Sequence, residues 1–105
     1  MQFLSFLESG QLTIVLEGEI DHSKAKSYIE SIQAKLELYS PSGCILDFTD
    51  VTFMDSSGIA VVINALRAVK KMGGTLSIVG LREQPFKILQ ISGVDKLVQI
   101  KEKVL

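Results

Sequence analysis

The chain alternates short apolar runs with longer segments of helical periodicity. Apolar residues between His22 and Leu38 recur at intervals of three and four, which predicts an amphipathic helix. Asp21 stands directly before this segment, where its side chain would cap the helix. By contrast, Cys44–Phe48 is almost continuously apolar. Such a run predicts a central strand that is covered on both faces.

Turn residues divide the rest of the chain. Gly73 and Gly74 are a strong helix stop. The predicted further strands are Phe3–Leu7, Gln11–Leu16, Thr75–Val79 and Leu97–Ile100, with helices from about Ser56 to Met72 and from about Arg82 to Ile91 and a loop over Thr49–Asp55. The order β-β-α-β-α-β-α-β predicts one α/β domain over residues 1–105. Its sheet would be mixed and mostly parallel, with about five strands, an antiparallel edge hairpin and three to four helices.

Composition excludes several classes of function. The 105 residues are 47% hydrophobic and 22% charged, which is incompatible with intrinsic disorder as the main state. The formal net charge of -1 and the sequence pI near 5.8 argue against a nucleic-acid binder. One cysteine and one histidine exclude an intramolecular disulfide and a cysteine-based zinc site. We expect no cofactor and no metal.

Apolar runs such as Ile59–Ile63 are much shorter than the roughly 20 residues that span a bilayer. The N-terminus lacks the basic region of a signal peptide. These features predict a cytoplasmic protein without a membrane partner.

Candidate chemistry concentrates at the end of the central strand, because open α/β sheets bind ligands at the carboxyl ends of their strands. Asp55 is predicted to cap the next helix, which puts Ser56 and Ser57 in its first turn. A phosphate there would meet free backbone N–H groups and the positive end of the helix dipole. It would also add roughly -1.5 to -2 charges beside Asp50 and Asp55. The alternative is that Asp-Ser-Ser-Gly is only capping chemistry.

Four segments carry a family resemblance. The sequence MDSSGI, which follows LDFTDVTF, resembles the signature of the STAS domain, specifically that of the bacterial anti-sigma factor antagonists. The segments GEIDHSKA, KKMGGTLSIVG and ILQISGVDKLVQI resemble the same family in the same order. The resemblance covers nearly the whole chain and implies a STAS-like fold.

This resemblance implies a phosphorylation switch. It assigns the phosphoacceptor role to Ser56, the first serine of the motif. In this family the unphosphorylated form binds an anti-sigma factor that is also a serine kinase, and this binding frees the sigma factor. The kinase inactivates the antagonist by phosphorylating it, and a PP2C-type phosphatase restores it. The chain would then be a substrate and a ligand, and not an enzyme.

Seven further residues are candidates for partner contact. They are Asp21, His22, Asp55, Ser57, Gly58, Asn64 and Arg67. Asp21 and His22 would join Ser56 on one face if the two helix starts are adjacent, as the resemblance implies. Ser23 stands where sporulation-type antagonists often carry a second histidine. The physiological pathway therefore stays open.

Three alternative functions differ in how well the sequence supports them. The same domain could be a scaffold or adaptor subunit of a stress-sensing or transport complex, with little regulation at Ser56. A metal-dependent phosphoacceptor would use the aspartates near the strand end, but the chain lacks the acidic pair and the lysine that such a site needs. A nucleotide hydrolase would need a phosphate-binding loop of the GxxxxGK[ST] type, which is absent from the sequence.

Overall fold

The computed structural model describes residues 4–103 and contains five strands and three α-helices. In chain order the elements are β1 (Ser5–Glu8), β2 (Gln11–Ile20), α1 (His22–Tyr39), β3 (Gly43–Met54), α2 (Ser57–Lys71), β4 (Thr75–Val79), α3 (Glu83–Ser92), a 3₁₀ turn (Val94–Lys96) and β5 (Gln99–Lys101). The predicted order of elements is confirmed. The predicted start of the first strand at Phe3 lies outside the described residues.

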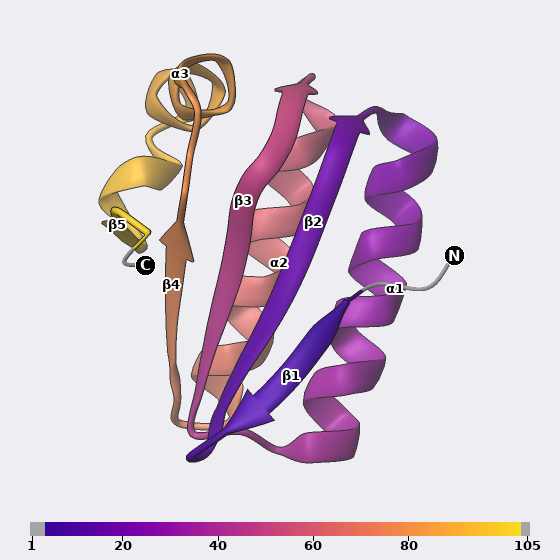
Figure 1. Cartoon of the computed structure of the whole chain (residues 1–105), viewed down its shortest axis with the longest axis vertical. Coiled ribbons are helices and arrows are strands. Elements are labelled where there is room, and N and C mark those ends of the chain that lie inside the picture. The colour runs from indigo at the N-terminus through magenta and orange to yellow at the C-terminus, as the bar shows by residue number, and fades with distance from the viewer. Residues whose placement is uncertain (1–3, 104–105) are drawn as a thin grey trace.

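The strands lie side by side in their chain order, β1-β2-β3-β4-β5 (Figure 1). β1 pairs with β2 in an antiparallel hairpin, and every other neighbouring pair is parallel. The expected mixed, mostly parallel sheet with an antiparallel edge is therefore confirmed. Because all the parallel strands point the same way, their carboxyl ends meet at one edge.

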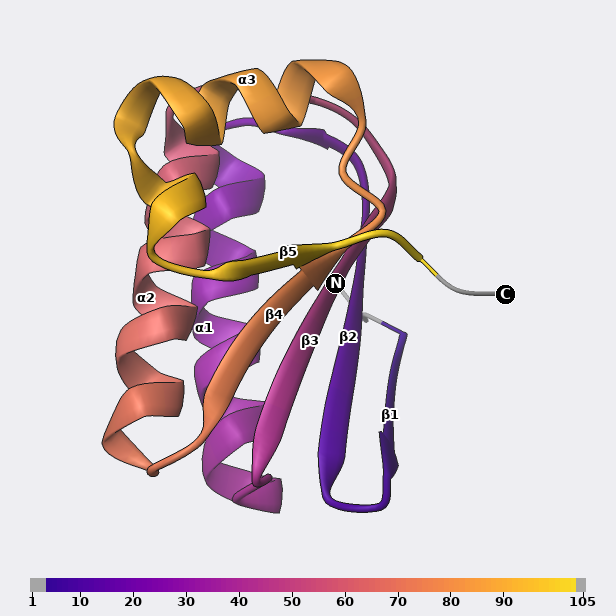
Figure 2. The ribbon, with the colours of Figure 1, turned by 90° about the vertical axis from the view of Figure 1, so that its left-hand side faces the viewer.

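The helices α1 and α2 pack side by side on one face of the sheet, and α3 lies across its end (Figure 2). The core lies between this face and the two helices. Its members include Leu12, Ile14 and Leu16 of β2, Leu46 and Phe48 of β3, Tyr28, Ile32 and Leu36 of α1, and Val61, Val62 and Ala65 of α2. The predicted strand Cys44–Phe48 is covered on both faces: Cys44, Leu46 and Phe48 belong to the core, and on the other face Asp47 is buried and Ile45 is half-buried. The two long helices cover only the first of these faces (Figure 2).

The predicted caps of the two long helices have a physical basis in the structure. The Asp21 carboxylate accepts a hydrogen bond from the Lys24 N–H at 3.0 Å, which confirms Asp21 as the cap of α1. α2 ends at Lys71. Gly73 then takes a φ of +77°, which a glycine adopts at little cost.

The predicted loop over Thr49–Asp55 is wrong, because β3 continues to Met54 and β2 continues beside it to Ile20. The pairing shifts register twice over this stretch, so Val51 and Met54 are both buried although they are three residues apart. A regular strand buries every second residue. Because of the two irregularities, buried and exposed residues do not alternate here, and the sequence lacks the usual pattern of a strand.

Tyr28 of α1 supports the first irregularity from inside the core. Its hydroxyl accepts a hydrogen bond from the Glu17 N–H at 3.0 Å and donates to the Glu17 carbonyl at 3.4 Å. Burial of this phenol raises its pKa above the ordinary value, although the hydrogen bond with Glu17 acts in the opposite direction. The helix thus satisfies backbone groups of β2 at the point where regular pairing with β3 is interrupted.

Asp47 is a buried carboxylate on the sheet face that lies away from α1 and α2. It accepts hydrogen bonds from the Thr49 N–H at 2.9 Å and the Thr49 hydroxyl at 2.6 Å. The Lys103 ammonium lies 2.9 Å from its other oxygen. Burial acts to raise the pKa of Asp47, but the bonds from Thr49 and Lys103 outweigh it and hold this pKa below its ordinary value.

Acid is expected to weaken the fold through Asp47. Since its pKa is lower in the folded state, the ionised carboxylate stabilises the protein fully above the unfolded-state pKa of about 3.9. This stabilisation is lost as the pH falls from that value through the folded-state pKa. Urea unfolding between pH 7 and pH 2.5 measures the effect. Asp47→Asn, which cannot ionise, should show a shallower loss of the free energy of unfolding, and an equal slope in both proteins would contradict the assignment.

Candidate functional site

The carboxyl ends of β2 and β3 meet at one edge of the sheet, and both long helices begin there (Figure 1). Ile20 pairs with Met54, and the Asp55 N–H donates to the Ile20 carbonyl at 3.2 Å. This bond joins the two segments from which α1 and α2 start. The predicted adjacency of the Asp21–His22 segment and the Ser56 segment is therefore present in the structure.

Asp55 caps the second of these helices. Its carboxylate accepts a hydrogen bond from the Ser57 N–H at 2.8 Å, as a capping side chain does in the first turn. The helix proper begins at Ser57, one residue later than predicted. Ser56 already has helical dihedral angles, with φ -61° and ψ -17°. It thus occupies the junction between the capping residue and α2.

The Ser56 side chain is exposed and available to another protein. Within residues 4–103, no side chain forms a hydrogen bond with its hydroxyl. A serine that attacks a substrate normally needs an adjacent base to activate it. Ser56 is therefore better suited to accept a group in the active site of a second protein than to carry out chemistry itself.

The residue two positions later has a different environment. Gly58 is buried, and a Cβ atom at this position would lie 2.5 Å from the Met54 sulfur, which is itself buried. A larger residue here would therefore have to displace the end of the Met54 side chain. Its role in partner contact stays a prediction, and the structure gives Gly58 a packing role beneath the Ser56 segment.

A groove runs between the first turns of α1 and α2 beside the serines. It has a volume of about 360 Å³ and is lined by His22, Ala25, Lys26, Ile29, Glu30, Ser57 and Ala60. Its lining is mostly apolar, and its charged members come from α1. His22 and Ser57, which were predicted from different parts of the chain, thus contact the same hollow.

Two predicted contact residues lie farther along α2. Asn64 and Arg67 are both exposed, and the helical rise puts them about 12 Å and about 16 Å from Ser56 along the axis. The Asn64 amide donates to the Ala60 carbonyl at 2.8 Å. The structure therefore gathers Asp21, His22, Asp55, Ser56 and Ser57 at one end of the fold, while Asn64 and Arg67 extend that surface down one helix.

Sequence reasoning missed two residues near Ser56. Phe53 is 46% exposed at the end of β3, three residues before Ser56. An apolar residue in the supposed loop was the available signal. Gln84 of α3 bonds to the backbone of Met54, and no local pattern indicates that contact.

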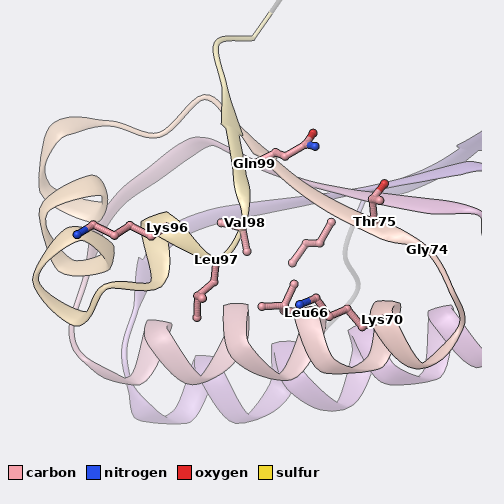
Figure 3. A pocket seen from close by; sticks show the side chains of 9 residues that line it. Leu66, Lys70, Gly74, Thr75, Lys96, Leu97, Val98 and Gln99 are labelled. Atoms are coloured by element: carbon pink, nitrogen blue, oxygen red, sulfur yellow. The ribbon is translucent and has the colours of Figure 1, made fainter.

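A second hollow lies at the other end of α2, where Lys70, Gly74 and Val98 contribute to its wall (Figure 3). Its volume is about 270 Å³. Lys70 and Lys96 are both among its lining residues, and the Lys96 side chain extends away from the hollow (Figure 3). Lys70 is about 20 Å from Ser57 by helical rise, which separates this hollow from the Ser56 surface.

Two other kinds of feature are absent from residues 4–103. No three histidine, cysteine, aspartate or glutamate side chains gather there in a group that could hold a metal ion. None of the helices in that range has the length and apolar character required to cross a membrane. The one cysteine, Cys44, is buried, and burial raises the pKa of its thiol to about 12.

Comparisons with known proteins agree with this geometry. An anti-sigma-B factor antagonist of Listeria monocytogenes is 30% identical over 97 residues, which cover 90% of this chain and 82% of the relative. The anti-sigma-B factor antagonist of Bacillus subtilis is 35% identical over 92 residues, covering 88% and 83%. Both relatives match over most of their own length.

Solved structures show the same fold. The anti-sigma factor antagonist SpoIIAA in its unphosphorylated form matches with a TM-score of 0.84 at 22% identity, covering 98% of this chain and 89% of that one. The phosphorylated form of SpoIIAA from Bacillus matches with a TM-score of 0.76 at 22% identity, covering 98% and 92%. The family model for the STAS domain matches residues 7–104. The chain therefore belongs to the STAS domain family.

Proposed function

We propose that this chain is an anti-sigma factor antagonist and that phosphorylation of Ser56 switches off its binding. The observation that carries the proposal is an exposed serine, free of hydrogen bonds from other side chains of residues 4–103, at the capped start of α2. Two relatives that match most of this chain are named as anti-sigma-B factor antagonists. SpoIIAA, which has the same fold, occurs in phosphorylated and unphosphorylated forms.

The proposed cycle has three proteins besides the antagonist. The unphosphorylated chain binds an anti-sigma factor, which then releases its sigma factor. The anti-sigma factor is also a serine kinase, and it transfers the γ-phosphoryl group of ATP to the Ser56 hydroxyl oxygen. A PP2C-type phosphatase hydrolyses the phosphoserine and restores the binding form. The antagonist itself is a ligand and a substrate in this cycle, and we expect all of its steps to occur in the cytoplasm.

The binding surface that we propose is centred on the groove between α1 and α2. An apolar side chain of the partner would enter the groove against Ala25, Ile29 and Ala60. The rim residues Asp21, His22 and Ser57 would make polar contacts around it. Asn64 and Arg67 would extend the contact along α2, and the buried Gly58 would keep the helix start in place.

The switch that we propose works by charge and bulk. A phosphate on Ser56 adds roughly -1.5 to -2 charges at pH 7, directly beside the Asp55 carboxylate and close to Asp21. A partner surface that fits the neutral serine would meet this charge without a compensating cation. Association would weaken through repulsion and desolvation, and the backbone would need no rearrangement.

Affinity capture tests this proposal. The wild-type chain and Ser56→Asp serve as baits in a lysate of the bacterium that encodes the chain, and mass spectrometry identifies what each retains. We expect the wild-type bait to retain a small ATPase of the histidine-kinase-like fold and the Ser56→Asp bait to lose most of it. The negative charge of aspartate approximates that of the phosphate at the same position.

The control for added charge is Ser9→Asp, because Ser9 is an exposed turn residue with φ +52°, a conformation that aspartate tolerates. This variant should retain the same ATPase as the wild type. Capture of one shared complex without a kinase by all three baits would reject the switch. That outcome would favour a scaffold or adaptor subunit.

A further inference from the structure

The backbone just before Ser56 is held from both sides. On one side the Asp55 N–H donates to the Ile20 carbonyl of β2. On the other side the Met54 N–H donates to the Gln84 side-chain oxygen at 2.9 Å, and the Gln84 amide nitrogen donates to the Met54 carbonyl at 2.9 Å. Gln84 belongs to α3, which is 30 residues away in sequence.

These bonds occur in the part of β3 that extends beyond its pairing with β4. β4 ends at Val79, which pairs with Asp47, so the last residues of β3 extend beyond it. A glutamine amide offers one carbonyl and an NH₂ group, and it therefore pairs with a backbone as a strand would. Arg82 adds a second contact, because its Nε–H donates to the Thr49 carbonyl at 2.8 Å. The start of α3 thus substitutes for the missing part of a strand.

Met54 transmits this restraint to the start of α2. Its side chain is fully buried and lies so close to Gly58 that a Cβ atom there would displace it. The carboxylate of the next residue, Asp55, caps α2 by accepting a hydrogen bond from the Ser57 N–H. A displacement of the Met54 backbone would therefore move the cap and the first turn of α2, and Ser56 lies between them.

We propose that Gln84 is a positioning residue for Ser56. Its hydrogen bonds to Met54 fix the position and orientation in which Ser56 is presented to a kinase and to the binding partner. This inference rests on the proposed function for its consequence in phosphorylation. Its structural part, the restraint on residues 54–58, is independent of any partner.

The test compares Gln84→Ala with Gln90→Ala, a matched truncation of an exposed glutamine on the same helix. Amide exchange measured by NMR should become about tenfold faster at residues 54–58 in Gln84→Ala, because two hydrogen bonds to Met54 are lost. Gln84→Glu keeps the acceptor for the Met54 N–H but loses the donor to the carbonyl, so its exchange should be intermediate. Exchange in the core of β2 should stay unchanged in all three variants.

The second readout is steady-state phosphorylation by the kinase that the wild-type chain captures. We expect kcat/KM to fall about tenfold for Gln84→Ala, mainly through KM, and to stay at the wild-type value for Gln90→Ala. Wild-type exchange in Gln84→Ala would overturn the inference. So would faster exchange with unchanged kcat/KM, since presentation of Ser56 would then not depend on Gln84. Failure of the proposed function would appear differently, as a wild-type chain that the captured kinase does not phosphorylate.

Discussion

Ser56→Ala is expected to abolish phosphate incorporation by the captured kinase, whereas Ser57→Ala should retain most of it. The reason lies in the two environments. Ser56 is exposed at the junction before α2, while Ser57 is partly buried, faces the α1–α2 groove and has its N–H bonded to Asp55. Incubation with labelled ATP, followed by mass spectrometry of the modified peptide, measures both variants.

Binding provides the control for this result. Ser56→Ala removes a hydroxyl without adding charge, so this variant should capture the kinase as well as the wild-type chain does. Retention of phosphate in Ser56→Ala together with its loss in Ser57→Ala would assign the acceptor role to Ser57. Loss of both phosphate and capture in Ser56→Ala would indicate that the substitution damages the surface.

Gly80→Ala is expected to lower the free energy of unfolding by about 3 kcal/mol, more than the same substitution at Gly73. Gly80 has a φ of +73°, and a Cβ atom there would collide with Thr49, including its backbone nitrogen at 3.0 Å. A collision with backbone is costly because Thr49 lies in β3, which is paired with β2 at Asp47 and at Asp50. Urea unfolding followed by circular dichroism measures the loss.

Gly73→Ala is the matched control, because Gly73 has a φ of +77° but nothing within 4 Å of the Cβ position. It carries the conformational cost alone, about 1 kcal/mol. The difference between the two variants isolates the collision with Thr49. Equal losses would show that the turn after β4 is loosely packed on β3, and they would also weaken the case for its neighbours Arg82 and Gln84 as restraints.

The long helices and most strands of this fold can be predicted from local patterns. α1 follows from the spacing of its buried residues and from one capping aspartate, and the structure differs from the prediction by a single residue at its end. The capping role of Asp55 is equally local, since donor and acceptor are two residues apart. Such features depend on near neighbours in the chain, which a sequence displays directly.

The features that were missed depend on distant partners. The second half of β3 is bulged, so its buried residues do not alternate, and it is held by pairing with β2 and by side chains near the start of α3. The groove exists only because two helix starts lie side by side. Gln84 looks like any helix glutamine until the fold brings Met54 to it. A single sequence carries no signal for such contacts.

The chain-ordered sheet has a consequence for how the protein folds. Each strand pairs with the strand that precedes it in the chain. No later strand therefore has to insert between two earlier ones. Short sequence separation between partners lowers the entropic barrier to folding. During synthesis, the β2–α1–β3 unit has all of its own parts before α3 leaves the ribosome. We therefore expect strands to join the sheet in chain order from the N-terminus. The hydrogen bonds between Gln84 and Met54 should be among the last to form.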